Sequence, residues 1–279
     1  MKSERMLASV KLVILDLDGV VYRGKDLLPG AAETIAWLRE RGLQVYFLTN
    51  NSTLSRRQYV ERLQAMGIPT RQEEMMTSAY ATALYFKAKG LLAATVLVVG
   101  EEGLKEELRS AGLTVIGELV PDGRADFVVV GMDREFRYQH LYDAQQAILG
   151  GARFIATNRD PTYPVENGGV MPGGGSIVAA IAAASGQEPL LIGKPEPVTV
   201  EEILELSGRS PGEAIIVGDR LDTDIAMGLR VGLWTALVLS GVTSRQEAES
   251  APPSMRPHWV LEGVADLPRL LESEDLSAH

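Results

Sequence analysis

The chain has 279 residues, 46% hydrophobic and 23% charged, a composition typical of globular domains and not of disordered chains. Its 27 lysines and arginines against 37 aspartates and glutamates give a net charge of −10, which opposes binding to a nucleic-acid backbone. The chain contains no cysteine, so disulfides, thiolate catalysis and cysteine-ligated zinc are excluded.

The chain is longer than the size at which most single hydrophobic cores stop growing, so we expect one large domain or two modest ones. Near the N-terminus, Lys2, Glu4 and Arg5 precede an apolar run that Asp16 and Asp18 cut short. A signal peptide or membrane span needs a longer uncharged stretch. We therefore expect a cytoplasmic protein that binds neither membranes nor nucleic acids.

Strands and helices alternate in the first part of the chain. Short runs rich in β-branched residues are typical of strands buried on both faces, and the segments between them have apolar residues at helical spacing. The predicted elements are a strand at Val10–Leu15, a helix at Ala31–Arg41, a strand at Val45–Leu48 and a helix at Ser55–Met66. This alternation predicts a parallel sheet covered by helices.

From about Ser78 the pattern starts again and predicts a second α/β unit inserted in the first. Its predicted elements are a strand at Thr95–Val99, a helix at Glu102–Ser110, a strand at Phe127–Val130, a helix at Tyr138–Leu149, a strand at Arg153–Ala156, a loop from Thr157 to Ser176 and a helix at Ile177–Ser185. The first unit then resumes with a helix at Val198–Leu206 and strands at Ala214–Val217 and Trp234–Leu239.

We therefore predict an α/β fold with a Rossmann-like, doubly wound parallel sheet as its core and a second, inserted α/β domain. The predicted core comprises residues 1–78 and 187–279, and the predicted insert comprises residues 79–186.

Asp16 and Asp18 follow the first predicted strand. Residues two apart in a strand point to the same side, so we expect both carboxylates beyond the carboxyl edge of the sheet, where open α/β sheets bind ligands. The alternative is a strand-to-turn signal with solvated side chains.

A second acidic cluster, Asp219, Asp222 and Asp224, follows the strand predicted at Ala214–Val217. Several carboxylates near one another favour Mg²⁺. The alternative is capping of a helix N-terminus by Asp222 or Asp224, and we interpret Asp222 as such a cap.

Two further polar sites lie at other strand ends. Thr49 offers a hydroxyl, and we expect the backbone N–H groups that follow it, beginning with Asn50, to open a helix N-terminus that binds anions. Lys194 stands between Gly193 and Pro195 after an apolar run. Its alternative interpretation is a solvated surface lysine.

Each of these motifs follows a predicted strand, and their order along the chain resembles that of the haloacid dehalogenase superfamily. The closer similarity is to its NagD-like branch of nitrophenylphosphatases and phosphoglycolate phosphatases. The matching segments are DLDGVVYRG from Asp16, FLTNN from Phe47, IGKP from Ile192 and VGDRLDTDI from Val217.

The resemblance implies Mg²⁺-dependent hydrolysis of small phosphate monoesters through a phospho-aspartate. Asp16 would be the nucleophile, and Asp18 the general acid and then the general base. Asp16, the backbone carbonyl of Asp18, and Asp219 would hold Mg²⁺, with Asp224 orienting metal-bound water. Thr49, Asn50 and Lys194 would bind the phosphate oxygens.

The resemblance also implies that the insert is a cap over the active site. Asn158, Arg159 and Asp160 match the cap loop that faces the site, so they are candidates for substrate specificity. The alternative for Asp160, which precedes Pro161, is that it starts a turn. A homodimer formed through the cap is a further implication.

By resemblance the natural substrate is a small phosphorylated metabolite such as phosphoglycolate, glycerol phosphate, pyridoxal phosphate, a sugar phosphate or a nucleoside monophosphate. One alternative is a phosphotransferase or mutase on the same scaffold. Another is a catalytically silent protein that binds phosphorylated ligands, which the presence of Asp16, Asp18, Lys194 and Asp219 opposes.

Overall fold

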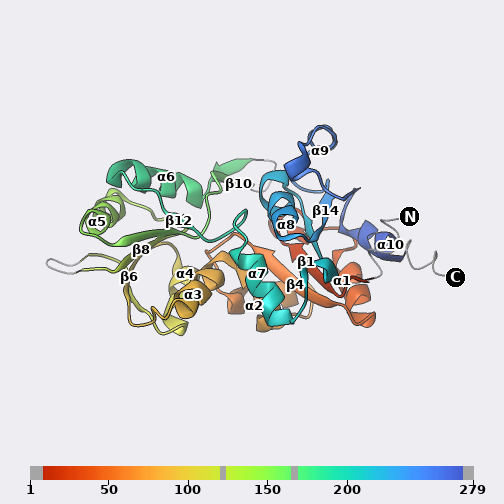
Figure 1. Ribbon diagram of the computed structural model, residues 1–279, viewed down its shortest axis with the longest axis horizontal. Coiled ribbons are helices and arrows are strands. Elements are labelled where there is room, and N and C mark those ends of the chain that lie inside the picture. Colours follow the sequence, from red (N-terminus) through yellow and green to blue (C-terminus); the bar gives the residue numbers. More distant parts are fainter. Residues whose placement is uncertain (1–8, 120–123, 165–168, 273–279) are drawn as a thin grey trace. The chain divides into compact units, whose positions relative to one another are not determined.

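The computed structural model describes residues 9–119, 124–164 and 169–272 (Figure 1). The chain divides into two compact units. Unit 1 comprises Met1–Thr49, Arg62–Met75 and Val200–His279, and unit 2 comprises Asn50–Glu61 and Met76–Thr199. The insert expected at 79–186 lies within unit 2, and its boundaries as a domain stay a prediction.

The sheet of unit 1 has six strands in the order β15-β14-β13-β1-β4-β5. The strands are β1 (Leu12–Asp16), β4 (Gln44–Thr49), β5 (Met75–Thr77), β13 (Ala214–Gly218), β14 (Trp234–Val238) and β15 (Trp259–Leu261). The pairings from β15 through β14, β13 and β1 to β4 are parallel. Every residue of β1 and β13 is buried, as their uninterrupted apolar sequences predict.

The order of strands reverses direction at β1. The chain leaves β1 through α1 (Ala31–Glu40) to β4 on one side and later returns as β13 on the other. Doubly wound sheets bind ligands at such a switch point, beyond the carboxyl ends of the two neighbouring strands. Leu15 pairs with Val217, so Asp16 and Asp219 come at this edge from adjacent strands.

Unit 2 contains a five-stranded sheet of parallel strands in the order β12-β9-β8-β6-β7. The strands are β6 (Thr95–Val99), β7 (Thr114–Ile116), β8 (Phe127–Val130), β9 (Arg153–Ala156) and β12 (Leu190–Leu191). The helices are α3 (Ser78–Ala88), α4 (Glu102–Ser110), α5 (Tyr138–Leu149) and α6 (Gly174–Ser185), with α5 and α6 on one face of the sheet and α3 and α4 on the other (Figure 1). Alternate residues of β6 and β8 form a core with α5 and α6.

The prediction of a loop from Thr157 to Ser176 is partly wrong. It contains the antiparallel strands β10 (Thr162–Pro164) and β11 (Val170–Pro172), and α6 begins at Gly174; residues 165–168 lie outside the described residues. Glycine is a poor helix former, but close packing requires it here. A Cβ at Gly175 would lie 2.3 Å from the Arg159 carbonyl oxygen.

The helix expected to open directly after Thr49 is also wrong, because α2 begins only at Arg56 (Arg56–Ala65). Asn51 Oδ1 accepts hydrogen bonds from Thr53 N (2.9 Å) and Thr53 Oγ1 (2.8 Å), a local side-chain turn that competes with helix formation.

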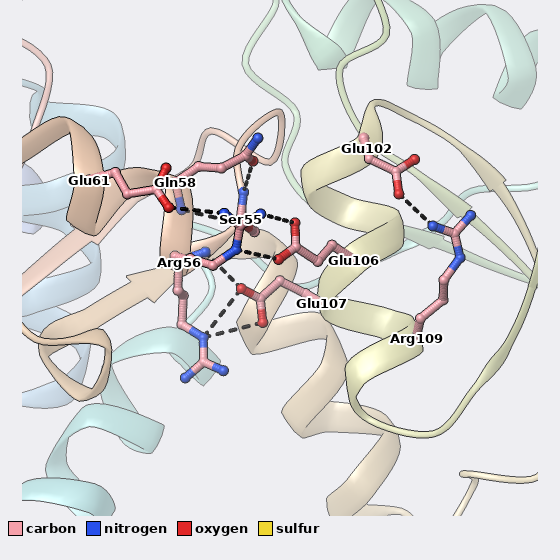
Figure 2. Close-up of polar contacts among 9 residues, drawn as sticks. Ser55, Arg56, Gln58, Glu61, Glu102, Glu106, Glu107 and Arg109 are labelled. Atoms are coloured by element: carbon pink, nitrogen blue, oxygen red, sulfur yellow. Dashed lines mark hydrogen bonds and ion pairs between the residues drawn. The ribbon is translucent and has the colours of Figure 1, made fainter.

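The start of α2 is shown in Figure 2. Ser55 N donates to Gln58 Oε1 (2.8 Å) and Gln58 N donates to Ser55 Oγ (3.4 Å), a reciprocal cap. Glu107 of α4 accepts from Arg56 N (2.7 Å) and from Arg56 Nε (3.2 Å). A buried carboxylate thus satisfies an amide at the first turn of α2.

The strands and α-helices not yet named are between two and ten residues long. They are β2 (Tyr22–Arg23), β3 (Asp26–Leu27), α7 (Val198–Ser207), α8 (Ala226–Val231), α9 (Arg245–Glu249) and α10 (Leu267–Glu272). Within the described part of the chain, we find no helix with the length and apolar character that crossing a membrane requires.

Candidate active site

Three buried carboxylates lie together in unit 1. Oxygen atoms of Asp16, Asp219 and Asp224 lie within 4.8 Å of one another, and these residues are 7%, 3% and 0% exposed. Three negative charges this close repel one another unless a cation lies among them or a proton is bound. Hard oxygen donors suit Mg²⁺, so these residues fit the cation that the sequence predicts.

A loop after β14 holds Asp219 in place. Val242 N donates to Asp219 Oδ2 (2.8 Å), and Thr243 N donates to the Asp219 carbonyl (3.1 Å). A Cβ at Gly241 would lie 2.0 Å from Asp219 Oδ2, and one at Gly19 would lie 2.5 Å from it. Our reading of the sequence missed this loop. The available signal was the Ser240-Gly241 pair, which comes at the carboxyl end of a predicted strand.

Asp224 packs directly on the end of β13. A Cβ at Gly218 would lie 2.2 Å from Asp224 Cβ, so the glycine before Asp219 leaves the space that Asp224 fills. Asp224 Oδ2 accepts from Arg220 N (3.3 Å). Residues Leu221–Ile225 form a π-helical turn, a conformation often found at functional sites.

The interpretation of Asp222 as a helix cap is wrong. The residue before the π-helical turn is Arg220, and the turn has no side-chain cap. The Asp222 carboxylate is 62% exposed and forms an ion pair with the Arg220 guanidinium (3.0 Å). Asp222 and Asp224 are two residues apart, and only Asp224 belongs to the group of three buried carboxylates.

Asp18 lies beyond the end of β1, which stops at Asp16. The chain turns at once, with Gly19 at φ 82° and Gly19 N donating to the Tyr22 carbonyl (2.9 Å). Strand alternation therefore stops before Asp18, which is half-buried. Thr49 is the last residue of β4 and is 3% exposed.

A second polar cluster lies within unit 2 and joins three loops. Asn50 Nδ2 donates to Asp160 Oδ2 (3.1 Å) and to the Lys194 carbonyl (3.1 Å), and Asn50 Oδ1 accepts from Lys194 N (2.8 Å). Asn158 Nδ2 donates to the Asn50 carbonyl (2.8 Å). Four predicted site residues from distant parts of the sequence are thus brought together.

Lys194 is 4% exposed, so its alternative interpretation as a solvated surface lysine is wrong. Arg159, by contrast, lies outside the polar cluster. Its side chain is 46% exposed and forms an ion pair with Glu188 (2.5 Å). Of the three candidates on the loop after β9, Asn158 and Asp160 contact the cluster and Arg159 faces away toward Glu188.

Comparison with known proteins is consistent with these features. A family model described as haloacid dehalogenase-like hydrolase matches residues 13–114, and a second, described as HAD-hydrolase-like, matches residues 191–267. A curated relative, 5'-nucleotidase YutF of Bacillus subtilis, is 38% identical over 240 residues, which is 86% of this chain and 91% of that protein.

Solved structures of similar proteins cover nearly the whole chain. The p-nitrophenyl phosphatase from Archaeoglobus fulgidus has a TM-score of 0.85 and 36% identity, covering 95% of this chain and 99% of its own. Glycerol phosphate phosphatase Rv1692 from Mycobacterium tuberculosis, in complex with magnesium, has a TM-score of 0.86 and 34% identity, covering 94% of this chain and 77% of its own.

Proposed function

This chain belongs to the haloacid dehalogenase-like hydrolases and is a phosphatase, and we propose that it hydrolyses small phosphate monoesters through an acyl phosphate on Asp16. The observation that carries this proposal is the burial of Asp16 with Asp219 and Asp224 at the switch point of the sheet. Three buried carboxylates this close to one another repel each other unless a cation or a proton offsets their charge, so their arrangement favours a site that binds a cation.

The proposed reaction has two halves. In the first, a carboxylate oxygen of Asp16 forms a bond to phosphorus while the bond to the leaving oxygen breaks, and Asp18 gives its proton to that oxygen. In the second, Asp18 takes a proton from water, whose oxygen attacks phosphorus, and the Asp16 carboxylate and inorganic phosphate are released. Covalent catalysis of this kind divides a very slow hydrolysis into two faster steps.

We propose that the Asp16 and Asp219 carboxylates and the backbone carbonyl of Asp18 would hold Mg²⁺. Asp224 would complete the site, directly or through water. When bound, Mg²⁺ supplies positive charge that offsets repulsion between the nucleophile and the phosphate. The loop at Val242 keeps the Asp219 carboxylate in one orientation, because its N–H bonds Oδ2.

In this proposal Thr49, the Asn50 N–H and the Lys194 ammonium bind the non-bridging phosphate oxygens. Support for Lys194 comes from its burial, since a lysine is rarely buried unless its ammonium pairs with a negatively charged group. Asn158, Arg159 and Asp160 are proposed to set specificity for a small phosphorylated metabolite.

The same proposal includes a homodimer formed through the inserted domain and a cytoplasmic location. The support for the dimer is the resemblance to the NagD-like branch alone. Sedimentation of the purified chain tests the dimer, and cell fractionation tests the location.

The deciding experiment measures nitrophenyl phosphate hydrolysis with Mg²⁺ and with EDTA, in the wild type and in Asp16→Asn. We expect turnover that requires Mg²⁺ and is lost in the variant. Asp18→Asn should accumulate phosphorylated protein, detected by mass spectrometry after rapid quenching. Asp222→Asn is the matched control, because Asp222 is exposed and paired only with Arg220 among the contacts described.

Turnover that persists in Asp16→Asn would exclude an acyl phosphate on Asp16.

A second experiment concerns the substrate. The values of kcat/KM for a nucleoside monophosphate, glycerol phosphate, a sugar phosphate and phosphoglycolate rank these compounds as substrates. Release of inorganic phosphate in the presence of an added sugar distinguishes hydrolysis from phosphoryl transfer to that sugar.

A further inference from the structure

The side chain of Asn50 is fully engaged within unit 2. A carboxamide has two N–H donors and one acceptor oxygen. Both donors of Asn50 are used, on Asp160 Oδ2 and on the Lys194 carbonyl, and its oxygen accepts from Lys194 N. The residue is 7% exposed, so losing any of these bonds leaves a polar group unsatisfied away from water.

The backbone of Asn50 is fixed as well. Its carbonyl accepts from Ser78 Oγ (2.5 Å) and from Asn158 Nδ2 (2.8 Å). Ser78 and Asn158 are 0% and 4% exposed. These two hydrogen bonds hold the backbone of Asn50 in place, and they therefore also fix the position from which its carboxamide contacts Lys194.

The residue before the lysine fits against the same carboxamide. A Cβ at Gly193 would lie 2.6 Å from Asn50 Oδ1 and 2.4 Å from the Thr157 carbonyl. Gly193 N donates to that Thr157 carbonyl (2.9 Å). The peptide that carries Lys194 is thus held from two sides, and this approach requires glycine at position 193.

We propose that Asn50 is a positioning residue: its side chain fixes the backbone of Lys194 and joins it to Asp160 on the predicted specificity loop. This inference rests on the proposed function and deepens it. The phosphate contact expected of Asn50 is then left to its backbone N–H. The carboxamide instead holds the backbone of Lys194 in position and bonds Asp160 at the same time. The phosphate-binding lysine and the predicted specificity loop of unit 2 are therefore connected through one side chain.

Asparagine is required over aspartate at this position because of the donors. In Asn50→Asp the shape is kept and Lys194 N still finds an acceptor. However, the second carboxylate oxygen would face Asp160 Oδ2 and the Lys194 carbonyl, each 3.1 Å away, with no proton between them. Two carboxylates at that distance share a proton or repel each other.

The test compares Asn50→Asp, Asn50→Ala and the double variant Asn50→Asp/Asp160→Asn. We expect Asn50→Ala to lower kcat/KM about 10²-fold, the scale of a misplaced binding group, and Asn50→Asp to lower it further at neutral pH. Activity of Asn50→Asp should recover as the pH falls and one proton is shared. The double variant, which exchanges donor and acceptor, should recover part of the loss.

The matched control is Gln139→Glu. Gln139 Nε2 donates to Asp143 Oδ1 (2.8 Å) elsewhere in unit 2, so this change also sets a carboxylate against a carboxylate. It should leave kcat/KM and its pH profile unchanged. The midpoint of thermal unfolding of every variant is measured, so that rates refer to folded protein.

A binding measurement separates this inference from the proposed function. Titration calorimetry with inorganic phosphate and Mg²⁺ should show weaker phosphate binding in Asn50→Ala than in the wild type. If the wild type lacks Mg²⁺-dependent turnover, the proposed function fails. If the wild type turns over and both Asn50 variants match its kcat/KM, pH profile and phosphate affinity, this inference alone is overturned.

Discussion

Gly241 and the carboxylate of Asp219 pack so closely that a Cβ at position 241 would lie 2.0 Å from Asp219 Oδ2 and 2.3 Å from Asp219 Cβ. The same oxygen accepts the Val242 N–H at 2.8 Å. The two residues follow neighbouring strands, β13 and β14. The backbone of the loop after β14 therefore sets the orientation of the carboxylate of Asp219, the residue that follows β13.

Gly241→Ala should therefore displace Asp219 and weaken Mg²⁺ binding. Changes in groups that orient metal ligands typically cost about 10–100-fold in metal affinity, and we expect an effect in that range. Titration of the metal-free protein with Mg²⁺ measures it. Gly212→Ala is the control, since a Cβ there would have nothing within 4 Å; equal Mg²⁺ affinities in the two variants would contradict the prediction.

Asp224→Asn should affect the metal-free and metal-bound proteins in opposite directions. Asp224 lies within 4.8 Å of Asp16 and Asp219, so removing its charge relieves repulsion when no cation is present. We expect a higher thermal midpoint in EDTA and a Mg²⁺ affinity lower by about 10–100-fold. Calorimetric unfolding with and without Mg²⁺ tests both. A variant less stable than the wild type in EDTA would show that repulsion is not the dominant effect.

Glu107→Gln should destabilise the start of α2. The Glu107 side chain is 4% exposed and pairs with Arg56, which is 16% exposed. Removing one partner of a buried ion pair costs about 3–5 kcal/mol; because glutamine keeps an acceptor for Arg56 N, we expect the lower part of that range. Hydrogen exchange of the first-turn amides of α2 measures the change.

The control for that variant is Glu61→Gln. Glu61 pairs with Arg57 (2.9 Å), but both side chains are more than half exposed, at 61% and 56%. Exposed ion pairs contribute about 0–1 kcal/mol to the free energy of unfolding, so hydrogen exchange of the α2 amides should change little in this variant. Similar acceleration in the two variants would show that burial does not decide the contribution of these pairs.

His258 should titrate below the ordinary histidine range. Burial lowers its pKa from 6.5, and its Nδ1 accepts from Thr235 N (3.2 Å), which requires the unprotonated nitrogen. With a folded-state pKa below the unfolded one, the stabilising contribution of His258 is complete above about pH 6.5 and is lost as the pH falls through the folded pKa.

An NMR titration of the imidazole tests this prediction directly. The free energy of unfolding should also fall less steeply with acid in His258→Gln than in the wild type. A measured pKa at or above 6.5 would contradict both the lowered value and the direction of the stability change.

Several elements follow from local sequence. The strand at Thr95–Val99 and the helices at Glu102–Ser110 and Tyr138–Leu149 have the bounds predicted from their apolar spacing. The strand before Asp16 and the one before Asp219 were also predicted within a few residues. Such a segment buries either an uninterrupted apolar run or one continuous face. The spacing of its own apolar side chains therefore indicates whether it forms a strand or a helix.

Family membership could also be predicted from the sequence, because four short motifs in a fixed order need no knowledge of their contacts. The parallel doubly wound sheet followed from alternating strands and helices. The roles of the individual site residues stay predictions until the variants above are measured.

What only the tertiary structure decided depends on contacts between residues far apart in the chain. Asn50 bonds Lys194 across 144 positions, and the loop at Val242 bonds Asp219 across 23. Asp222 and Asp224 are the same residue type, yet one is exposed and the other fully buried. Sequence periodicity determines which residues form a strand and where it ends. The packing of separate loops then determines which polar groups at that end are desolvated together, and no local pattern contains that information.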